Sequence, residues 1–348
     1  MASAPEHYAG REQAYVKHFF LRNYFSDLIH KIASAYDEFV YVDGFAGPWQ
    51  SADDRLGDTS LGIALAAMRS AREAWTRKGR NVRMHAMLVE KRAAAFRDLQ
   101  RVPANYPDID VRPFHGEFVP LVPRLLREMP PKAFAFLFID PKGWRIDINA
   151  VAPLLHRPNT EVLFNFMFDF INRAASISGA PIVEGLNALI PVGDWRERLI
   201  SARALGSRSL ADVRKEILVD AFSQTVAKIG GYEFVAETPV FRTLSDRTLY
   251  SLIYATRKAP GIEVFRRAQT KTLREQEKVR RNVRQAKDSG PQTEAFSGLG
   301  NDCQRNREIS LFGANRSRMD AARTSGRRHP FENLRRRVAE GPRQARRD

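Results

Sequence analysis

"VYVDGFAGPW", residues 40–49, joins an apolar run to an acid and two closely spaced glycines. The β-branched and aromatic residues before Asp43 predict a buried strand that ends at this acid. Small residues directly after it allow a ligand to approach the backbone closely. A simple strand-ending turn at Asp43 is the alternative. The candidate ligand loop consists of Asp43, Gly44, Phe45, Ala46 and Gly47.

The same pattern recurs along the chain. Continuous apolar runs alternate with segments of helical periodicity, which is typical of a parallel sheet covered by helices on both faces. We therefore predict an α/β, Rossmann-like fold, with an antiparallel strand pair near its end. Expected strands lie at 38–43, 82–90, up to about 115, 133–140, 160–168, 232–241 and 247–258, and expected helices at 11–36, 61–75, 91–102, 119–129 and 147–155.

Five segments are expected. They are an N-terminal helical segment (1–36), a Rossmann-like domain (37–260) with a helical insertion at about 171–229, a basic helix (261–288) and a basic, flexible tail (289–348).

Positive charge concentrates at the C-terminal end. Residues 257–348 contain 24 Lys or Arg and 11 Asp or Glu, a net charge of +13 out of +16 for the whole chain. A nearly neutral body with a basic end favours a polyanionic partner, most simply nucleic acid. A solvated tail that maintains solubility is the alternative.

Several classes of protein find no support in the sequence. No apolar run is long enough to cross a membrane, and the N-terminus lacks the apolar region of a secretory signal. Cys303 is the one cysteine, so an internal disulfide and a cysteine metal cluster are excluded. Metal-ligand spacing, a Walker loop and a G-x-S-x-G motif are also missing. We expect a cytoplasmic protein without a metal.

Acidic or polar residues end the first four predicted strands. In an open parallel sheet, ligands bind beyond the carboxyl ends of the strands. An acid after the second strand can bind both ribose hydroxyls, a polar residue after the third can reach an adenine amino group, and an acid after the fourth points toward the chemistry. Besides Asp43, these positions hold Glu90 with Lys91, Gly116 with Glu117, and Asp140.

Two nucleoside cofactors fit such a crevice, a dinucleotide or S-adenosylmethionine. The dinucleotide motif requires G-x-G-x-x-G at the start of a helix, whereas this loop reads G-x-x-G and then Pro48. Asp43 would repel pyrophosphate oxygens but would attract a ligand with an ammonium and a sulfonium group. The sign of this charge favours S-adenosylmethionine.

The chain resembles the three-Cys-motif partner protein (TcmP) family over about residues 11–285. The motifs that carry the resemblance are "KHFFLRNYF", "VYVDGFAGPW", "FLFIDPKGW", "EVLFNFMFDFINRA" and "LYSLIYATRKAPGIEVF". More distantly it is similar to ribosomal RNA adenine-N6 methyltransferases. The resemblance implies a class I methyltransferase-like fold, S-adenosylmethionine, and a partner protein with a radical-SAM-like three-cysteine motif. It also matches the residues of the Asp43 loop and Glu90 to cofactor-binding positions.

The catalytic motif departs from that of amino-group methyltransferases. The resemblance matches Asp140 and Pro141 to the start of Asp-Pro-Pro-Tyr, but Lys142, Gly143 and Trp144 follow here. Trp144 can still stack on a base. Lys142 places a cation where an amine would bind. These changes put adenine-N6 chemistry in doubt and leave methyl transfer to another atom open.

Further candidates come from the flanking elements. Lys17 could contact a phosphate and His18 could accept a proton, or both could be ordinary helix residues. Asn165 lies within an apolar strand, where a polar side chain needs a partner. Arg173 and the basic-helix residues Arg266, Arg267, Lys271 and Arg274 are candidate nucleic-acid contacts.

The sequence thus favours an S-adenosylmethionine-dependent methyltransferase acting on nucleic acid. The alternative is a non-catalytic nucleic-acid-binding or phage-defence accessory protein that keeps the fold and works with a radical-SAM-like partner.

Overall fold

The computed structural model describes residues 8–47, 51, 56–141, 143–177, 179–204 and 210–288. All these residues belong to the first of the two units into which the chain divides, residues 1–289. The predicted flexible tail and Lys142 therefore lie outside the described residues.

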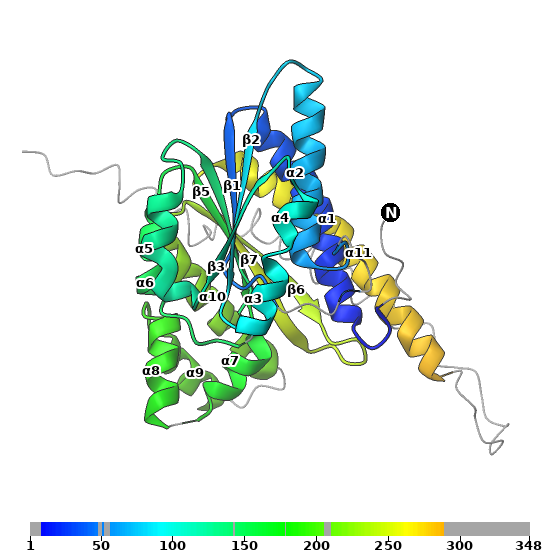
Figure 1. The fold of residues 1–348 in the computed structure, drawn as a ribbon. Coiled ribbons are helices and arrows are strands. Elements are labelled where there is room, and N and C mark those ends of the chain that lie inside the picture. The colour runs from blue at the N-terminus through cyan, green and yellow to red at the C-terminus, as the bar shows by residue number, and fades with distance from the viewer. Residues whose placement is uncertain are drawn as a thin grey trace, which may run out of the picture. The chain divides into compact units, whose positions relative to one another are not determined.

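A seven-stranded sheet with the order β3-β2-β1-β4-β5-β7-β6 forms the centre of the first unit (Figure 1). The first five strands are parallel, and β7 pairs antiparallel with both β5 and β6. This confirms the predicted Rossmann-like, class I methyltransferase-type sheet with a C-terminal antiparallel pair. The strands are β1 (Glu38–Asp43), β2 (Arg83–Glu90), β3 (Asp110–His115), β4 (Phe134–Ile139), β5 (Thr160–Phe166), β6 (Phe234–Phe241) and β7 (Thr248–Thr256).

Helices cover both faces of the sheet (Figure 1). The predicted insertion is helical and supplies most of α7 to α10. The helices are α1 (Glu12–Ala33), α2 (Ser60–Thr76), α3 (Ala93–Leu99), α4 (Val102–Asn105), α5 (Phe118–Glu128), α6 (Ile148–His156), α7 (Phe168–Ala174), α8 (Ala180–Leu189), α9 (Trp195–Ala204), α10 (Leu210–Gly230) and α11 (Ala259–Asp288).

Alternate residues of the central strands enter two separate cores, because side chains along a strand point to opposite faces. Phe39 and Tyr41 of β1 pack with α1, α2 and α11, whereas Val40 and Val42 pack with α5, α6 and the insertion helices. Burial on both faces explains why these strands are apolar throughout rather than alternating.

Two of the helix boundaries that differ from the sequence prediction are explained by proline. The single helix expected at 91–102 is split into α3 and α4, because Pro103 lacks an N–H and would clash with the carbonyl of Leu99 in a continuous helix. The basic helix α11 begins earlier than expected, at Ala259, since Pro260 is tolerated in a first helical turn.

Among the described helices, none combines the length and the apolar character needed to cross a bilayer.

The start of α2 is fixed by the loop that precedes it. Thr59 caps the helix by accepting the Gly62 N–H at 3.0 Å. A Cβ on Gly62 would lie 2.1 Å from the carbonyl oxygen of Leu56, which has a φ of 56°. Only glycine at position 62 allows the loop to cross the helix so closely.

Gly62→Ala should therefore lower the free energy of unfolding by about 2 kcal/mol, since overpacking outweighs the gain in helix propensity. Urea denaturation measures this effect. Gly179→Ala is the control, because no atom lies within 4 Å of the new methyl group there. Equal stability of the two variants would contradict the close packing.

Candidate cofactor and acceptor site

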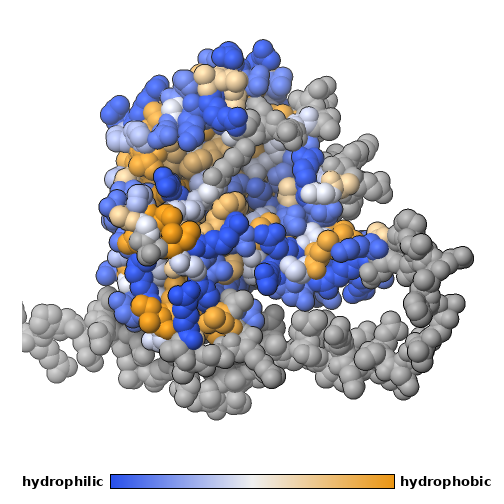
Figure 2. Space-filling model, turned by 90° about the horizontal axis from the view of Figure 1, so that it is seen from below, coloured by the Kyte–Doolittle hydropathy of each residue, from blue (hydrophilic) through white to orange (hydrophobic). Residues whose placement is uncertain are grey.

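A cavity of about 840 Å³ opens at the carboxyl ends of the parallel strands. Figure 2 views this end of the molecule, where hydrophobic and hydrophilic side chains lie side by side. The cavity adjoins β1 and β4, where the strand order reverses and ligands of open α/β sheets bind. Its size is that of a typical small-molecule site.

Asp43 ends β1 and is only 2% exposed. Its Oδ1 accepts the Phe45 N–H at 2.9 Å, and its Oδ2 accepts the Tyr41 hydroxyl at 3.1 Å. Burial raises the pKa of Asp43 to about 7, and the nearby Asp140 also raises it, whereas the two hydrogen bonds and Lys17 oppose the shift. A carboxyl group held in this way is poised to gain from a cation in the cavity.

The loop after Asp43 has little room for side chains. The Gly44 N–H donates to the Phe138 carbonyl at 3.0 Å, and the Ala46 N–H donates to the Val89 carbonyl at 2.8 Å. A Cβ on Gly44 would meet the ring of Phe118 at 3.0 Å. Gly44, Phe45, Ala46 and Gly47 all line the cavity. The loop is therefore pinned to both neighbouring strands while its backbone faces the cavity.

Glu90 ends β2 and is 4% exposed. Its Oε1 accepts the Arg92 N–H at 2.6 Å, which fixes the carboxyl group beside the cavity. A Cβ on Gly47 would lie 3.0 Å from Glu90 Oε2, so the glycine leaves space for this acid. The predicted neighbours Lys91, Gly116 and Glu117 also line the cavity, and Lys91 Nζ lies 3.5 Å from Glu117 Oε1.

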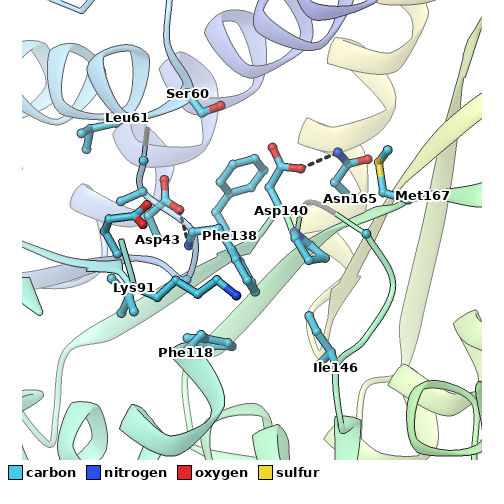
Figure 3. A pocket seen from close by; sticks show the side chains of 18 of the residues that line it. Asp43, Ser60, Leu61, Lys91, Phe118, Phe138, Asp140, Ile146, Asn165 and Met167 are labelled. Carbon is cyan, nitrogen blue, oxygen red and sulfur yellow. Dashed lines mark hydrogen bonds between the residues drawn. The ribbon is translucent and has the colours of Figure 1, made fainter. Parts of the chain in front are cut away.

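Asp140 follows β4 and binds two partners from distant segments. Lys17 Nζ of α1 lies 2.6 Å from its Oδ2, and Asn165 Nδ2 of β5 lies 2.5 Å from its Oδ1. Figure 3 shows Asn165 turning its nitrogen to Asp140 and its oxygen toward Met167. The Asp140 and Lys17 side chains are 18% and 16% exposed. All three residues line the cavity, so the predicted candidates Lys17, Asp140 and Asn165 form one cluster.

His18 lines the cavity from α1 and is buried. Its Nδ1 lies 3.0 Å from the Tyr8 hydroxyl. Burial, together with the positive charges of Lys17, Arg22 and Arg11, holds the pKa of His18 well below its ordinary value of 6.5. The imidazole is therefore neutral at neutral pH, and it is a weak proton acceptor.

Pro141, Gly143 and Trp144 line the cavity beyond Asp140. Gly143 has a φ of +136°, a conformation that favours glycine. Trp144 is half-buried, and its ring lies so close to α8 that a Cβ on Gly185 would approach it to 2.6 Å. Trp144 therefore lines the cavity and also packs against the helical insertion.

Of the predicted substrate or nucleic-acid contacts, Asn165 lines this cavity, whereas Arg173 and the four residues of the basic helix do not. Arg173 forms an ion pair with Asp169 on α7. Four exposed residues on α11, namely Arg266, Arg267, Lys271 and Arg274, belong to a helix that packs on α1 and β6. In the part of the chain that the structure describes, no group of three potential metal ligands occurs.

Sequence reasoning missed Tyr41, which holds Asp43, and Phe170, which lines the cavity from α7. Tyr41 could have been found, because residues two apart on a strand share a face. No sequence pattern predicts the position of Phe170, because it depends on how α7 packs against β7.

The strand order and the site at its switch point define a class I methyltransferase-type Rossmann-like fold. No protein family model matches the chain, and no curated protein matches it in sequence. Twenty-four chains of solved structures show likeness, among them the following three. An O-methyltransferase from Bacillus cereus in complex with SAH is 11% identical, with 68% of this chain and 80% of that chain covered and a TM-score of 0.35.

A DUF574 family protein from Streptomyces avermitilis is also 11% identical, with coverages of 68% and 82% and a TM-score of 0.36. Loganic acid methyltransferase with SAH is 8% identical, with coverages of 77% and 88% and a TM-score of 0.30. Because these scores are low, the assignment of the fold rests on the strand order alone.

The raised pKa of Asp43 has a consequence for stability. The folded-state pKa of about 7 exceeds the ordinary value of 3.8, so folding becomes less favourable as pH rises between these values. Asp43→Asn cannot ionise and should stabilise the ligand-free protein by about 4 kcal/mol at pH 8, with a gain that shrinks toward pH 4.

Urea denaturation at several pH values measures this gain. Asp98→Asn is the control, because that carboxyl group is 59% exposed and its weak ion pair contributes little. A pH-independent difference between wild type and Asp43→Asn would contradict the role assigned to the buried carboxyl group.

Proposed function

We propose that the protein is an S-adenosylmethionine-dependent methyltransferase that acts on nucleic acid. The observation that carries this proposal is the buried Asp43 carboxyl group beside the cavity at the β1/β4 switch point. A phosphate chain would face electrostatic repulsion there. The ammonium group of a methionine tail would instead pair with the Asp43 carboxylate and offset the cost of burying its charge.

The remaining lining supports the nucleoside half of the same ligand. Glu90 lies at the carboxyl end of β2, where its second oxygen can accept a ribose hydroxyl. Gly116 and Glu117 follow β3 and can contact the adenine. Lys91 also lines the cavity, with its Nζ 3.5 Å from Glu117 Oε1. The residues present therefore fit the cofactor, which would supply the transferable methyl group.

The protein's own contribution to transfer is positional. Asp140 lies where an acceptor would approach, with its carboxylate held by Lys17 and Asn165. A methyl group moves by in-line displacement, so holding the acceptor in line supplies much of the catalysis. Pro141 and Trp144 are proposed to border the acceptor, and Lys142 belongs to the same motif.

Nucleic acid is the proposed substrate because of charge. The basic segment from residue 257 onward carries most of the net positive charge, and Arg266, Arg267, Lys271 and Arg274 on α11 are exposed to solvent. Lysine and arginine on one helix provide the sequence-independent part of nucleic-acid affinity. The TcmP resemblance adds a three-Cys-motif protein as a proposed partner.

One observation favours a second candidate, a non-catalytic binding or phage-defence accessory protein. Both oxygens of Asp140 already bind protein groups, Lys17 and Asn165. An acceptor amine would have to compete with these groups for the carboxylate oxygens. Transfer of labelled methyl groups to mixed DNA and RNA distinguishes the candidates, since tight cofactor binding without transfer identifies the second.

Isothermal titration calorimetry with S-adenosylmethionine tests the cofactor assignment. Asp43→Ala should weaken binding at least about a hundredfold, because it removes the buried partner of a charge. Glu90→Gln should weaken it about tenfold through loss of charge-assisted hydrogen bonds. Asp98→Ala serves as the exposed control on α3. Wild-type protein that releases no heat with this ligand would overturn the proposal.

Binding should also depend on pH. Below the Asp43 pKa of about 7, the cofactor must displace a proton, so affinity should fall up to about tenfold for each pH unit. 5′-Methylthioadenosine lacks the ammonium group, and its affinity should change little over the same range. Calorimetry from pH 5.5 to 8 compares the two ligands, and parallel pH profiles would contradict a contact between ammonium and Asp43.

A further inference from the structure

Two aromatic residues lie where the cavity meets the insertion. Trp144 follows β4, Phe170 lies on α7, and both line the cavity. Phe170 is 45% exposed, which makes it one of few large hydrophobic side chains on the described surface. An exposed aromatic residue at the edge of a cavity is a candidate contact for a ligand with a flat apolar face.

One arginine side chain lies beside each of these two aromatic rings. The guanidinium carbon of Arg145 lies 5.6 Å from the centre of the Trp144 ring, and that of Arg173 lies 4.8 Å from the centre of the Phe170 ring. Such cation–π pairs hold a planar cation beside a planar apolar surface. We call Trp144, Arg145, Phe170 and Arg173 the aromatic–arginine rim.

The insertion helices hold this rim in place. Helix α7 carries Phe170 and Arg173, while Gly185 of α8 lies directly against the Trp144 ring. A larger residue at position 185 would push the tryptophan away, since a Cβ there would come within 2.6 Å of it. Trp144 is therefore positioned by packing.

The ion pairs around the rim leave an excess of positive charge. Asp169 Oδ2 lies 3.2 Å from Arg173 and 2.8 Å from Arg242, so one carboxylate is shared by two guanidinium groups. Arg145 adds a third positive charge beside Trp144. Stacking surfaces with surrounding arginines are the combination that single-stranded nucleic acids bind.

We propose that the aromatic–arginine rim binds an unpaired base of single-stranded nucleic acid and the phosphates next to it, at the entrance to the acceptor end of the cavity. This inference rests on the proposed function for its nucleic-acid substrate. Duplexes hide their base faces in the stack, so a stacking rim selects single strands or flipped bases.

The test measures fluorescence anisotropy of the full chain with a labelled single strand of mixed sequence, in DNA and RNA forms, and with the matching DNA duplex. We expect tighter binding to a single strand than to the duplex, and the two single-stranded forms identify which sugar is preferred. Phe170→Leu should weaken single-strand binding about tenfold, because stacking is lost while an apolar side chain remains. Phe170→Tyr should retain it.

Two further sets of variants separate charge from stacking. Arg145→Ala and Arg173→Ala should each reduce the salt dependence of binding, by about one unit in the slope of log affinity against log salt concentration. Ile200→Ala is the control, because Ile200 is 69% exposed on α9 and does not line the cavity.

Calorimetry with S-adenosylmethionine on the same preparations distinguishes failure of the proposed function from failure of the rim proposal. If wild-type protein binds no cofactor, the proposed function fails. If cofactor binds but Phe170→Leu keeps wild-type affinity for single strands, or duplex binds as tightly as single strand, the rim proposal is overturned. Cofactor binding without any oligonucleotide binding would also overturn it and would point to a protein surface at the rim.

Discussion

The site depends on the cost of burying the carboxyl group of Asp43. Two donors, the Phe45 N–H and the Tyr41 hydroxyl, reach this group, and Asp140 lies close enough to raise its pKa further. Two hydrogen bonds do not offset full desolvation of an anion. In the ligand-free protein, the cost of burying the Asp43 charge is therefore only partly compensated. A cationic ligand bound at the switch point of the sheet would lower that cost.

The charges that line the cavity can be compared with the net charge of each candidate cofactor. Asp43 and Glu90 are buried at the ends of β1 and β2, whereas Asp140 is paired with the ammonium group of Lys17. S-adenosylmethionine carries a sulfonium, an ammonium and a carboxylate, which leaves one net positive charge. A dinucleotide would add negative charge to the same crevice. The lining as a whole holds five Asp or Glu and five Lys or Arg side chains. The preference for a cationic ligand therefore rests on the buried Asp43 and not on the overall charge of the lining.

Much of this arrangement could be predicted because parallel strands bring their carboxyl ends to one edge. Apolar runs located the strands, so the acids that end them, Asp43, Glu90 and Asp140, could be placed near one another without a structure. Sequence patterns do not predict proximity that depends on packing between distant segments. Lys17 and Asp140 are 123 residues apart, and no periodicity links them. Residue spacing likewise does not predict that Trp144 packs on Gly185.

The Lys17–Asp140–Asn165 cluster also constrains the chemistry. An ionised Asp140 can only accept hydrogen bonds, so Asn165 must turn its Nδ2 to it, and its Oδ1 is left buried without a hydrogen-bond partner in the structure. Such an orphaned acceptor costs stability and is retained where it serves a function or where the group can move. The same cluster joins α1 to β4 and β5 across the acceptor end of the cavity. An acceptor that reaches Asp140 would meet the contacts that α1 and β5 make there, so the N-terminal helix borders the proposed acceptor site.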